Sequence, residues 1–237
     1  MEFALSEEQG ILSESIKKMF DENISIDNLR DHSKGDKLLR KTIRRSIIDM
    51  GLPGLLIPEE YGGSGLGGLE ASLVAEQLGS YAVPSPWIGN SIMAPTAILF
   101  EKDNHLAEKW LPLIASGEIT ACISLSEVIG KRGDLGLAVN GDKVSGINIF
   151  GIDGELDPAI IITAVDNNLI LIETDNNGVE INEIPTIDST RPVVEIIFDS
   201  SNYVIIPGGK EAIQKTIDVG RIGLAADLLG ASQNMLN

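Results

Sequence analysis

The sequence has 237 residues, of which 43% are hydrophobic and 22% are charged, a composition typical of a globular protein with one large domain or two smaller ones. The formal net charge of −17 argues against a nucleic-acid partner and against an anionic membrane surface, because both recruit basic patches. One cysteine and two histidines exclude an internal disulfide and a four-ligand Cys/His zinc site, and the absence of a long apolar run or a signal-peptide pattern predicts a cytoplasmic protein without a membrane partner.

The first 117 residues predict helices. Ser6 followed by Gln9 predicts a capping box at the start of the first helix, and Leu12, Ile16 and Phe20 give that helix one apolar face. A glycine- and proline-rich loop is expected over residues 51–68. Further helices are expected near residues 36–50, 69–79, 90–101 and 104–115. Residues 1–117 are therefore predicted to form an N-terminal helical domain.

The hydrophobic period changes between residues 118 and 206. Short β-branched runs alternate there with turn residues, and Asn140-Gly141 between two apolar runs predicts a β-hairpin. Val179 and Ile181 alternate with polar residues, as expected for a half-buried antiparallel strand. Seven or eight such strands predict a central antiparallel β domain, a small barrel or sandwich, over residues 118–206.

The last part of the sequence, from Gly208 to Asn237, predicts a helix roughly 45 Å long. Its apolar residues recur every three to four positions, and no glycine cap, proline or basic last turn closes it. Such an apolar stripe needs a cover, from a continuation of the chain or from a partner. The fold class expected is α+β, with residues 207–237 as the start of an incomplete C-terminal helical bundle. The apolar residues of this stripe are Ile213, Ile217, Ile222, Leu229 and Met235.

The short motifs favour structural roles. Residues 63–68 match G-x-G-x-x-G, but helices on both sides, in place of a βαβ unit, favour a loop over a dinucleotide site. Lys131 and Arg132 are interpreted as a solvated turn, with contact to a pyrophosphate as the alternative. No Ser/His/Asp triad, carboxylate pair or P-loop emerges from the sequence.

Single residues that could carry chemistry also have a structural interpretation. His32 and His105 lie in polar helical segments and are expected at the surface. Cys122 lies in an apolar run and is expected to be a small buried hydrophobe, and Trp87 and Trp110 are expected to be core or interface anchors. The residues alone therefore indicate an α–β–α protein that awaits a partner.

Seven segments, taken together and in order, resemble the acyl-CoA dehydrogenase family. They are GLLIPEEYGG (54–63), EQLG (76–79), WLP (110–112), ASGE (115–118), LSE (125–127), TIDSTR (186–191) and LLGA (228–231). The resemblance extends over the whole chain. It implies an N-terminal helical domain, a central β domain and a C-terminal four-helix bundle, with FAD between them.

The resemblance also implies a reaction and a set of site residues. Members of the family oxidise an acyl-CoA thioester to the 2,3-enoyl product: a glutamate removes the α proton and the β hydrogen leaves as hydride to the flavin. By position, Ile123, Leu125 and Ser126 match the strand along the flavin ring, and Ser126 keeps the hydroxyl. Phe150 aligns with an aromatic residue that packs on the isoalloxazine, and Gly133 falls near a serine that contacts the substrate.

Several departures from the family pattern bear on activity. Gly133 has no hydroxyl to offer, its turn is one residue longer than in the family, and Ile152 replaces a hydroxyl residue that hydrogen-bonds the flavin. Residues 142–153 resemble a divergent branch whose members often work as unequal paired subunits. The catalytic glutamate and the remaining flavin contacts belong to the bundle that this sequence lacks, so no catalytic residue is assigned to it.

Three hypotheses follow from the resemblance. The first is an FAD-dependent acyl-CoA dehydrogenase or dehydrogenase-like polypeptide that is inactive alone, takes an acyl-CoA substrate and forms a homo- or hetero-oligomer. The second is a non-catalytic structural or regulatory subunit of a heteromeric acyl-CoA dehydrogenase. The third is a CoA- or flavin-binding module without redox turnover.

Overall fold

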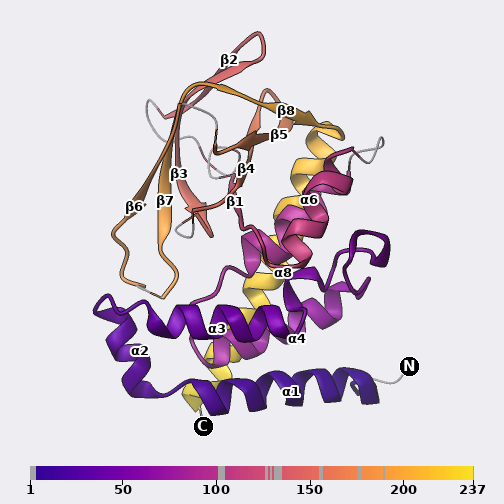
Figure 1. Ribbon diagram of the computed structural model, residues 1–237, viewed down its shortest axis with the longest axis vertical. Coiled ribbons are helices and arrows are strands. Elements are labelled where there is room, and N and C mark those ends of the chain that lie inside the picture. Colours follow the sequence, from indigo (N-terminus) through magenta and orange to yellow (C-terminus); the bar gives the residue numbers. More distant parts are fainter. Residues whose placement is uncertain are drawn as a thin grey trace.

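The computed structural model describes residues 4–100, 105–125, 128, 130, 135–154, 157–175, 178–188 and 190–236. Helices come first, a sheet follows, and a long helix ends the described chain, which confirms the α+β fold class. In Figure 1 the first helices lie at one end of the molecule and the strands at the other. The last helix, α8, starts beside strand β8 and runs down to the first helices, so it links the two ends.

The helices before the sheet begin largely where the sequence predicts them. At the start of the first helix the Gln9 N–H donates to Ser6 Oγ over 3.2 Å and the Ser6 N–H donates to Gln9 Oε1 over 3.0 Å, which confirms the capping box. The helices are α1 (Glu7–Asn23), α2 (Ile26–Ser33), α3 (Leu38–Asp49), η1 (Leu52–Gly54), η2 (Glu59–Tyr61), α4 (Gly68–Ser80), η3 (Ile88–Met93), α5 (Ala94–Ile98) and α6 (His105–Ala115).

Three local findings differ from the expectations. Helix α2 was not predicted because it has only eight residues and is mostly polar, although Ser25 and Asn28 form a second capping box. The helix expected over residues 90–101 is a π-helix, η3, that continues into α5. The prediction of a surface position for His32 is wrong: it is 6% exposed, and its Nδ1 lies 2.8 Å from the carbonyl oxygen of Asp36, because the turn after α2 folds back over the ring.

The strands form one eight-stranded sheet in the order β6-β7-β3-β1-β4-β5-β8, and β2 pairs with β3. Neighbouring strands are antiparallel except β1 and β4, which are parallel. The hairpin predicted at Asn140-Gly141 joins β2 to β3, where Asn140 pairs with Lys143. The strands are β1 (Ala121–Ser124), β2 (Gly136–Asn140), β3 (Lys143–Ile152), β4 (Ile160–Val165), β5 (Asn168–Glu173), β6 (Val179–Ile184), β7 (Val193–Asn202) and β8 (Val204–Ile206).

The sheet has two buried faces. On the inner face, Cys122 of β1 and Ile170 of β5 pack in one cluster with Val194 of β7, although β5 and β7 are separated in the sheet, so the sheet curls over this cluster. On the outer face, Ile123 and Ile162 pack against α5, α6 and α8. Because β1 and β4 are buried on both faces, their sequences are largely apolar and do not alternate with exposed polar residues.

Helix α8 (Gly209–Leu236) packs against α4 and η3 through small residues. A Cβ added at Gly79 of α4 would lie 1.9 Å from the carbonyl oxygen of Asp227, and one added at Gly230 would lie 1.8 Å from that of Glu76. The opposite side of α8 carries exposed large residues, among them Ile222 and Leu229, each 57% exposed. None of the described helices is both long and apolar enough to cross a membrane.

Candidate functional site

A cavity of about 440 Å³ lies where the sheet, η3 and α8 meet. Its walls come from the end of β1, the end of β3, the segment that leads into β7, and the middle of α8. Most of its side chains are apolar, which suits an uncharged ring or hydrocarbon chain. The residues that line it are Ile88, Met93, Leu125, Ile152, Asp153, Asp188, Arg191, Pro192, Val193, Ile217, Gly220, Arg221, Leu224, Asp227 and Leu228.

The sequence-predicted site residues lie only partly in this cavity. Leu125 follows β1 directly and lines the wall, whereas Ile123 is 2% exposed in the outer core and pairs with Ile152 across β1 and β3. Ile152 brings β3 to the same wall as Leu125. Ser126 and Gly133 lie outside the described residues. Leu125 and Ile152 are therefore the described residues that connect the predicted flavin strand to the cavity.

Phe150 lies on β3 at a β-bulge. The register between β3 and β7 shifts between Asn148 and Gly151, and Phe150 has a φ of +60°, a left-handed conformation that is uncommon for an aromatic residue. Its side chain is 36% exposed and is not part of the cavity wall. The bulge turns this side chain away from the regular pleat, so packing of Phe150 on a flavin ring stays a prediction.

An ion pair forms the polar part of the cavity wall. Arg191 Nη1 and Nη2 donate to the two carboxylate oxygens of Asp227, each over 2.6 Å, and Asp227 is 7% exposed. Burial alone lowers the pKa of Arg191, but the hydrogen bonds and the charge of Asp227 outweigh it, and the pKa is raised. This pair joins the segment before β7 to α8, so it fixes one side of the cavity.

The other carboxylates in the wall also accept hydrogen bonds. Asp153 Oδ2 accepts from the backbone N–H groups of Gly89 and Asn90, over 2.7 and 2.9 Å, and thereby ties β3 to η3. Asp188 Oδ1 accepts from the backbone N–H and the hydroxyl of Thr190, over 2.9 and 2.6 Å. The sequence analysis did not single out Asp153, Asp188 or Asp227 as site residues.

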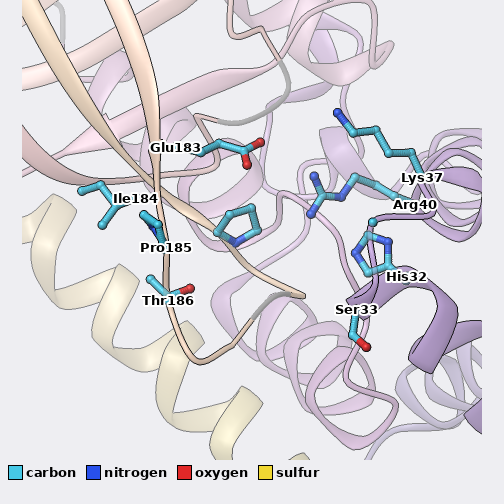
Figure 2. A pocket seen from close by; sticks show the side chains of 10 residues that line it. His32, Ser33, Lys37, Arg40, Glu183, Ile184, Pro185 and Thr186 are labelled. Carbon is cyan, nitrogen blue, oxygen red and sulfur yellow. The ribbon is translucent and has the colours of Figure 1, made fainter.

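A second cavity of about 450 Å³ lies between α2, α3 and the end of β6. Figure 2 shows His32 and Arg40 on one side and Glu183 on the other, with the Arg40 guanidinium directed toward Glu183. Arg40 Nη2 also donates to the carbonyl oxygen of Thr190 over 3.4 Å. This cavity contains none of the residues predicted for a flavin or substrate, and the charged residues of its described lining are Lys37, Arg40 and Glu183. The cavity beside α8 is therefore the better candidate for the functional site.

Metal chemistry has no candidate in the described part of the chain. Within those ranges, no group of three or more His, Cys, Asp or Glu side chains is placed to hold a metal ion. The described groups that the cavity beside α8 offers are its apolar walls, its ion pair and its hydrogen-bonded carboxylates.

Comparison with known proteins connects the first half of the chain to a family. Residues 6–118 match the sequence model of the family described as acyl-CoA dehydrogenase, N-terminal domain. The mitochondrial isovaleryl-CoA dehydrogenase of Pongo abelii is 32% identical over 126 residues, which are 52% of this chain and 30% of that protein. The matched region is thus less than a third of the relative's length.

Solved structures share the fold of nearly the whole chain. The structure of a glutaryl-coenzyme A dehydrogenase glutaryl-CoA complex has a TM-score of 0.86 at 19% identity, and the match covers 99% of this chain and 66% of that one. The ChsE4-ChsE5 complex from Mycobacterium tuberculosis gives a TM-score of 0.81 at 20% identity, over 99% of this chain and 66% of that one. These likenesses concern the fold.

Proposed function

We propose that this chain, whose residues 6–118 match the sequence model of the acyl-CoA dehydrogenase N-terminal domain, takes part in the FAD-dependent α,β-dehydrogenation of an acyl-CoA thioester. The observation that carries this proposal is the apolar cavity of about 440 Å³ at the end of β1. Leu125 and Ile152 line it, at the positions where the resemblance places the flavin ring. The acyl group is proposed to lie between these residues and α8.

The residues present fit a flavin in part. Leu125 and Ile152 give the cavity an apolar wall suited to the isoalloxazine ring, but Ile152 offers no hydrogen bond to its edge. FAD, when bound, supplies the acceptor for the hydride that leaves the β carbon of the acyl group. Leu125 and Ile152 would hold the ring, and the resemblance assigns contact with its pyrimidine edge to Ser126, which lies outside the described residues.

The walls of the cavity would prepare the acyl group for reaction. The thioester makes the α C–H bond acidic, and Ile88, Met93 and Leu224 would place hydrocarbon against it. An apolar surrounding strengthens hydrogen bonds to the charge that develops on the thioester oxygen. The Asp153 bonds to Gly89 and Asn90 hold η3 against β3, which keeps these walls in place.

The three carboxylates of the described cavity wall are poor candidates for the base that removes the α proton. Asp153 and Asp188 accept hydrogen bonds from backbone N–H groups, and Asp227 is paired with Arg191. These hydrogen bonds occupy carboxylate oxygens that a base would have to direct at the α C–H bond. We therefore propose that the base comes from outside the described residues and that the chain alone does not turn over substrate.

A second candidate function is a non-catalytic subunit of a heteromeric acyl-CoA dehydrogenase. The engaged carboxylates favour it, and so does Ile152, whose side chain lacks the hydroxyl expected for flavin contact. The exposed apolar side of α8, with Ile222 and Leu229, offers a surface for a partner. In this case the protein would bind acyl-CoA or shape a partner's site without flavin chemistry of its own.

Flavin binding and reduction separate the two candidates. The purified protein is titrated with FAD, and the flavin spectrum is then recorded under anaerobic conditions during the addition of an acyl-CoA. Bound flavin would support the first candidate. Reduction of that flavin by acyl-CoA only in the presence of a partner that supplies the base would support it further. A protein that never retains flavin but still binds acyl-CoA would support the second.

A matched pair of surface variants tests whether the cavity is the binding site. Leu224→Arg places a charge in the cavity wall at a residue that is already 48% exposed, so the fold should tolerate it. Leu69→Arg makes the same change on α4, at a residue that is 54% exposed. We expect the first variant to lose acyl-CoA binding and the second to keep it. Equal binding by both variants would place the ligand elsewhere.

A further inference from the structure

We infer that the cavity beside α8 selects acyl groups with an uncharged end and rejects those that end in a carboxylate. This inference rests on the proposed function, because it concerns the acyl group of the same site. It follows from the charges that line the cavity and from the partners that those charges already have.

Among the described lining residues, the charged groups have an excess of negative charge. Asp153, Asp188 and Asp227 supply three carboxylates, and two guanidinium groups oppose them. A carboxylate on the ligand would therefore lie beside a wall of like charge, and this repulsion opposes its binding.

The arginine most suited to receive a carboxylate is already engaged. Arg191 uses both terminal nitrogens in its bidentate contact with Asp227, over 2.6 Å each. A ligand carboxylate would have to displace Asp227, which is 7% exposed and would then remain buried without its partner. The ion pair thus occupies the position that could otherwise recognise an acidic acyl group.

The second arginine of the wall is also paired. Arg221 Nη1 donates to Asp218 one turn earlier on α8, over 3.2 Å. The remaining walls, from Ile88, Met93 and Leu228, are hydrocarbon and match an aliphatic chain. Among the described lining residues, each arginine therefore has a carboxylate partner, and the rest of the wall favours an apolar acyl end.

Two thioesters of the same acyl length test this directly: pentanoyl-CoA ends in a methyl group, and glutaryl-CoA ends in a carboxylate. Isothermal titration of the purified protein should give an affinity for pentanoyl-CoA at least roughly tenfold higher. Asp227→Asn removes one negative charge and releases Arg191. In this variant the affinity for glutaryl-CoA, relative to that for pentanoyl-CoA, should rise at least roughly tenfold.

Control variants separate this effect from a change in fold or in net charge. Asp49→Asn removes the carboxylate of an exposed ion pair with Arg45 on α3, 3.8 Å long, and should leave the affinity ratio unchanged. If Asp227→Asn does not fold, Asp188→Asn removes a different carboxylate of the wall and keeps an oxygen for Thr190, and it should shift the ratio in the same direction.

The outcomes distinguish the inference from the proposed function. If the wild-type protein binds both thioesters equally, or if the variants leave the ratio unchanged, the inference is wrong while acyl-CoA binding stands. If neither thioester binds, the proposed function fails and the inference falls with it. A ratio that shifts in Asp227→Asn but not in Asp49→Asn supports the inference.

Discussion

Replacing either glycine of the α4–α8 contact by alanine should destabilise the protein and disturb the cavity. A Cβ at Gly79 would lie 1.9 Å from the carbonyl oxygen of Asp227, and one at Gly230 would lie 1.8 Å from that of Glu76. Both obstacles are helix backbone, so no side-chain rotation relieves the contact. The two helices would have to separate by about 1.5 Å to restore ordinary van der Waals distances.

The size of the effect follows from two opposing contributions. Replacing glycine by alanine inside a helix gains about 1 kcal/mol in helix propensity. Overpacking a tight contact costs about 1–3 kcal/mol, and occasionally more. Because the obstacles are rigid, we expect the upper end of this cost, and therefore a net loss of about 2 kcal/mol in the free energy of unfolding. For a chain of this length such a loss lowers the Tm by about 4–8 °C.

The chain offers a matched control for this experiment. Gly10 lies in α1, and a Cβ there meets nothing within 4 Å. Gly10→Ala should therefore raise the free energy of unfolding by up to about 1 kcal/mol. The free energy of unfolding of Gly220→Ala should lie between those of Gly10→Ala and of the Gly79 and Gly230 variants. Its Cβ would lie 2.6 Å from the side chain of Met93, which is flexible and can move.

Urea and thermal unfolding followed by circular dichroism measure all four variants. If Gly79→Ala and Gly230→Ala are as stable as Gly10→Ala, the close contact between α4 and α8 does not exist as described. The Gly79 variant should also weaken acyl-CoA binding, because the backbone that its methyl group would displace belongs to Asp227 in the cavity wall.

Three further predictions concern charged and titrating groups. Arg191→Ala should cost roughly 2–4 kcal/mol in urea unfolding, because it strands the carboxylate of Asp227, while a double variant that also carries Asp227→Asn should cost less. Burial and the hydrogen bond to Asp21 raise the pKa of Tyr81 to about 12. The neutral phenol therefore stabilises the fold below about pH 10, and this contribution is lost as the pH rises through 12. Asp21→Asn should move the tyrosinate absorbance of Tyr81 to lower pH. The pKa of Glu70 is lowered from 4.5, first by the hydrogen bond that it accepts from Gln9. The contribution of Glu70 to the free energy of unfolding is therefore present above pH 4.5 and is lost as the pH falls through the lowered pKa. In Glu70→Gln the free energy of unfolding should fall less steeply with acid.

The sequence predicted the features that depend on neighbouring residues. The capping box at Ser6, the hairpin at Asn140 and the long last helix are each encoded within a few positions, and the structure contains all three. The short helix α2 was missed because it has only eight, mostly polar, residues, and the burial of His32 was missed because it depends on how the turn after α2 packs. Local pattern carries no information on such packing.

The wall of the candidate site also depends on packing that local sequence pattern does not encode. Leu125 and Ile152 could be named in advance because a resemblance in sequence order points to them. The pair of Arg191 and Asp227 joins residues that are 36 positions apart, and in the sequence Asp227 is one of three acidic residues of α8 with nothing to distinguish it. Only the packing of α8 against α4 brings its carboxylate to the arginine.

The two sides of α8 differ in residue type and in role. The sequence pattern drew attention to large apolar residues, and the structure leaves Ile222 and Leu229 among them exposed. The side that faces α4 and η3 carries Gly220, Gly223 and Gly230 instead, because only small residues allow such a close approach. The glycine side therefore fixes the position of α8 and of the cavity wall that it supplies. The position of this cavity wall therefore depends on the contact of α8 with α4 and η3, and a partner bound to the exposed side of α8 would not be needed to fix it.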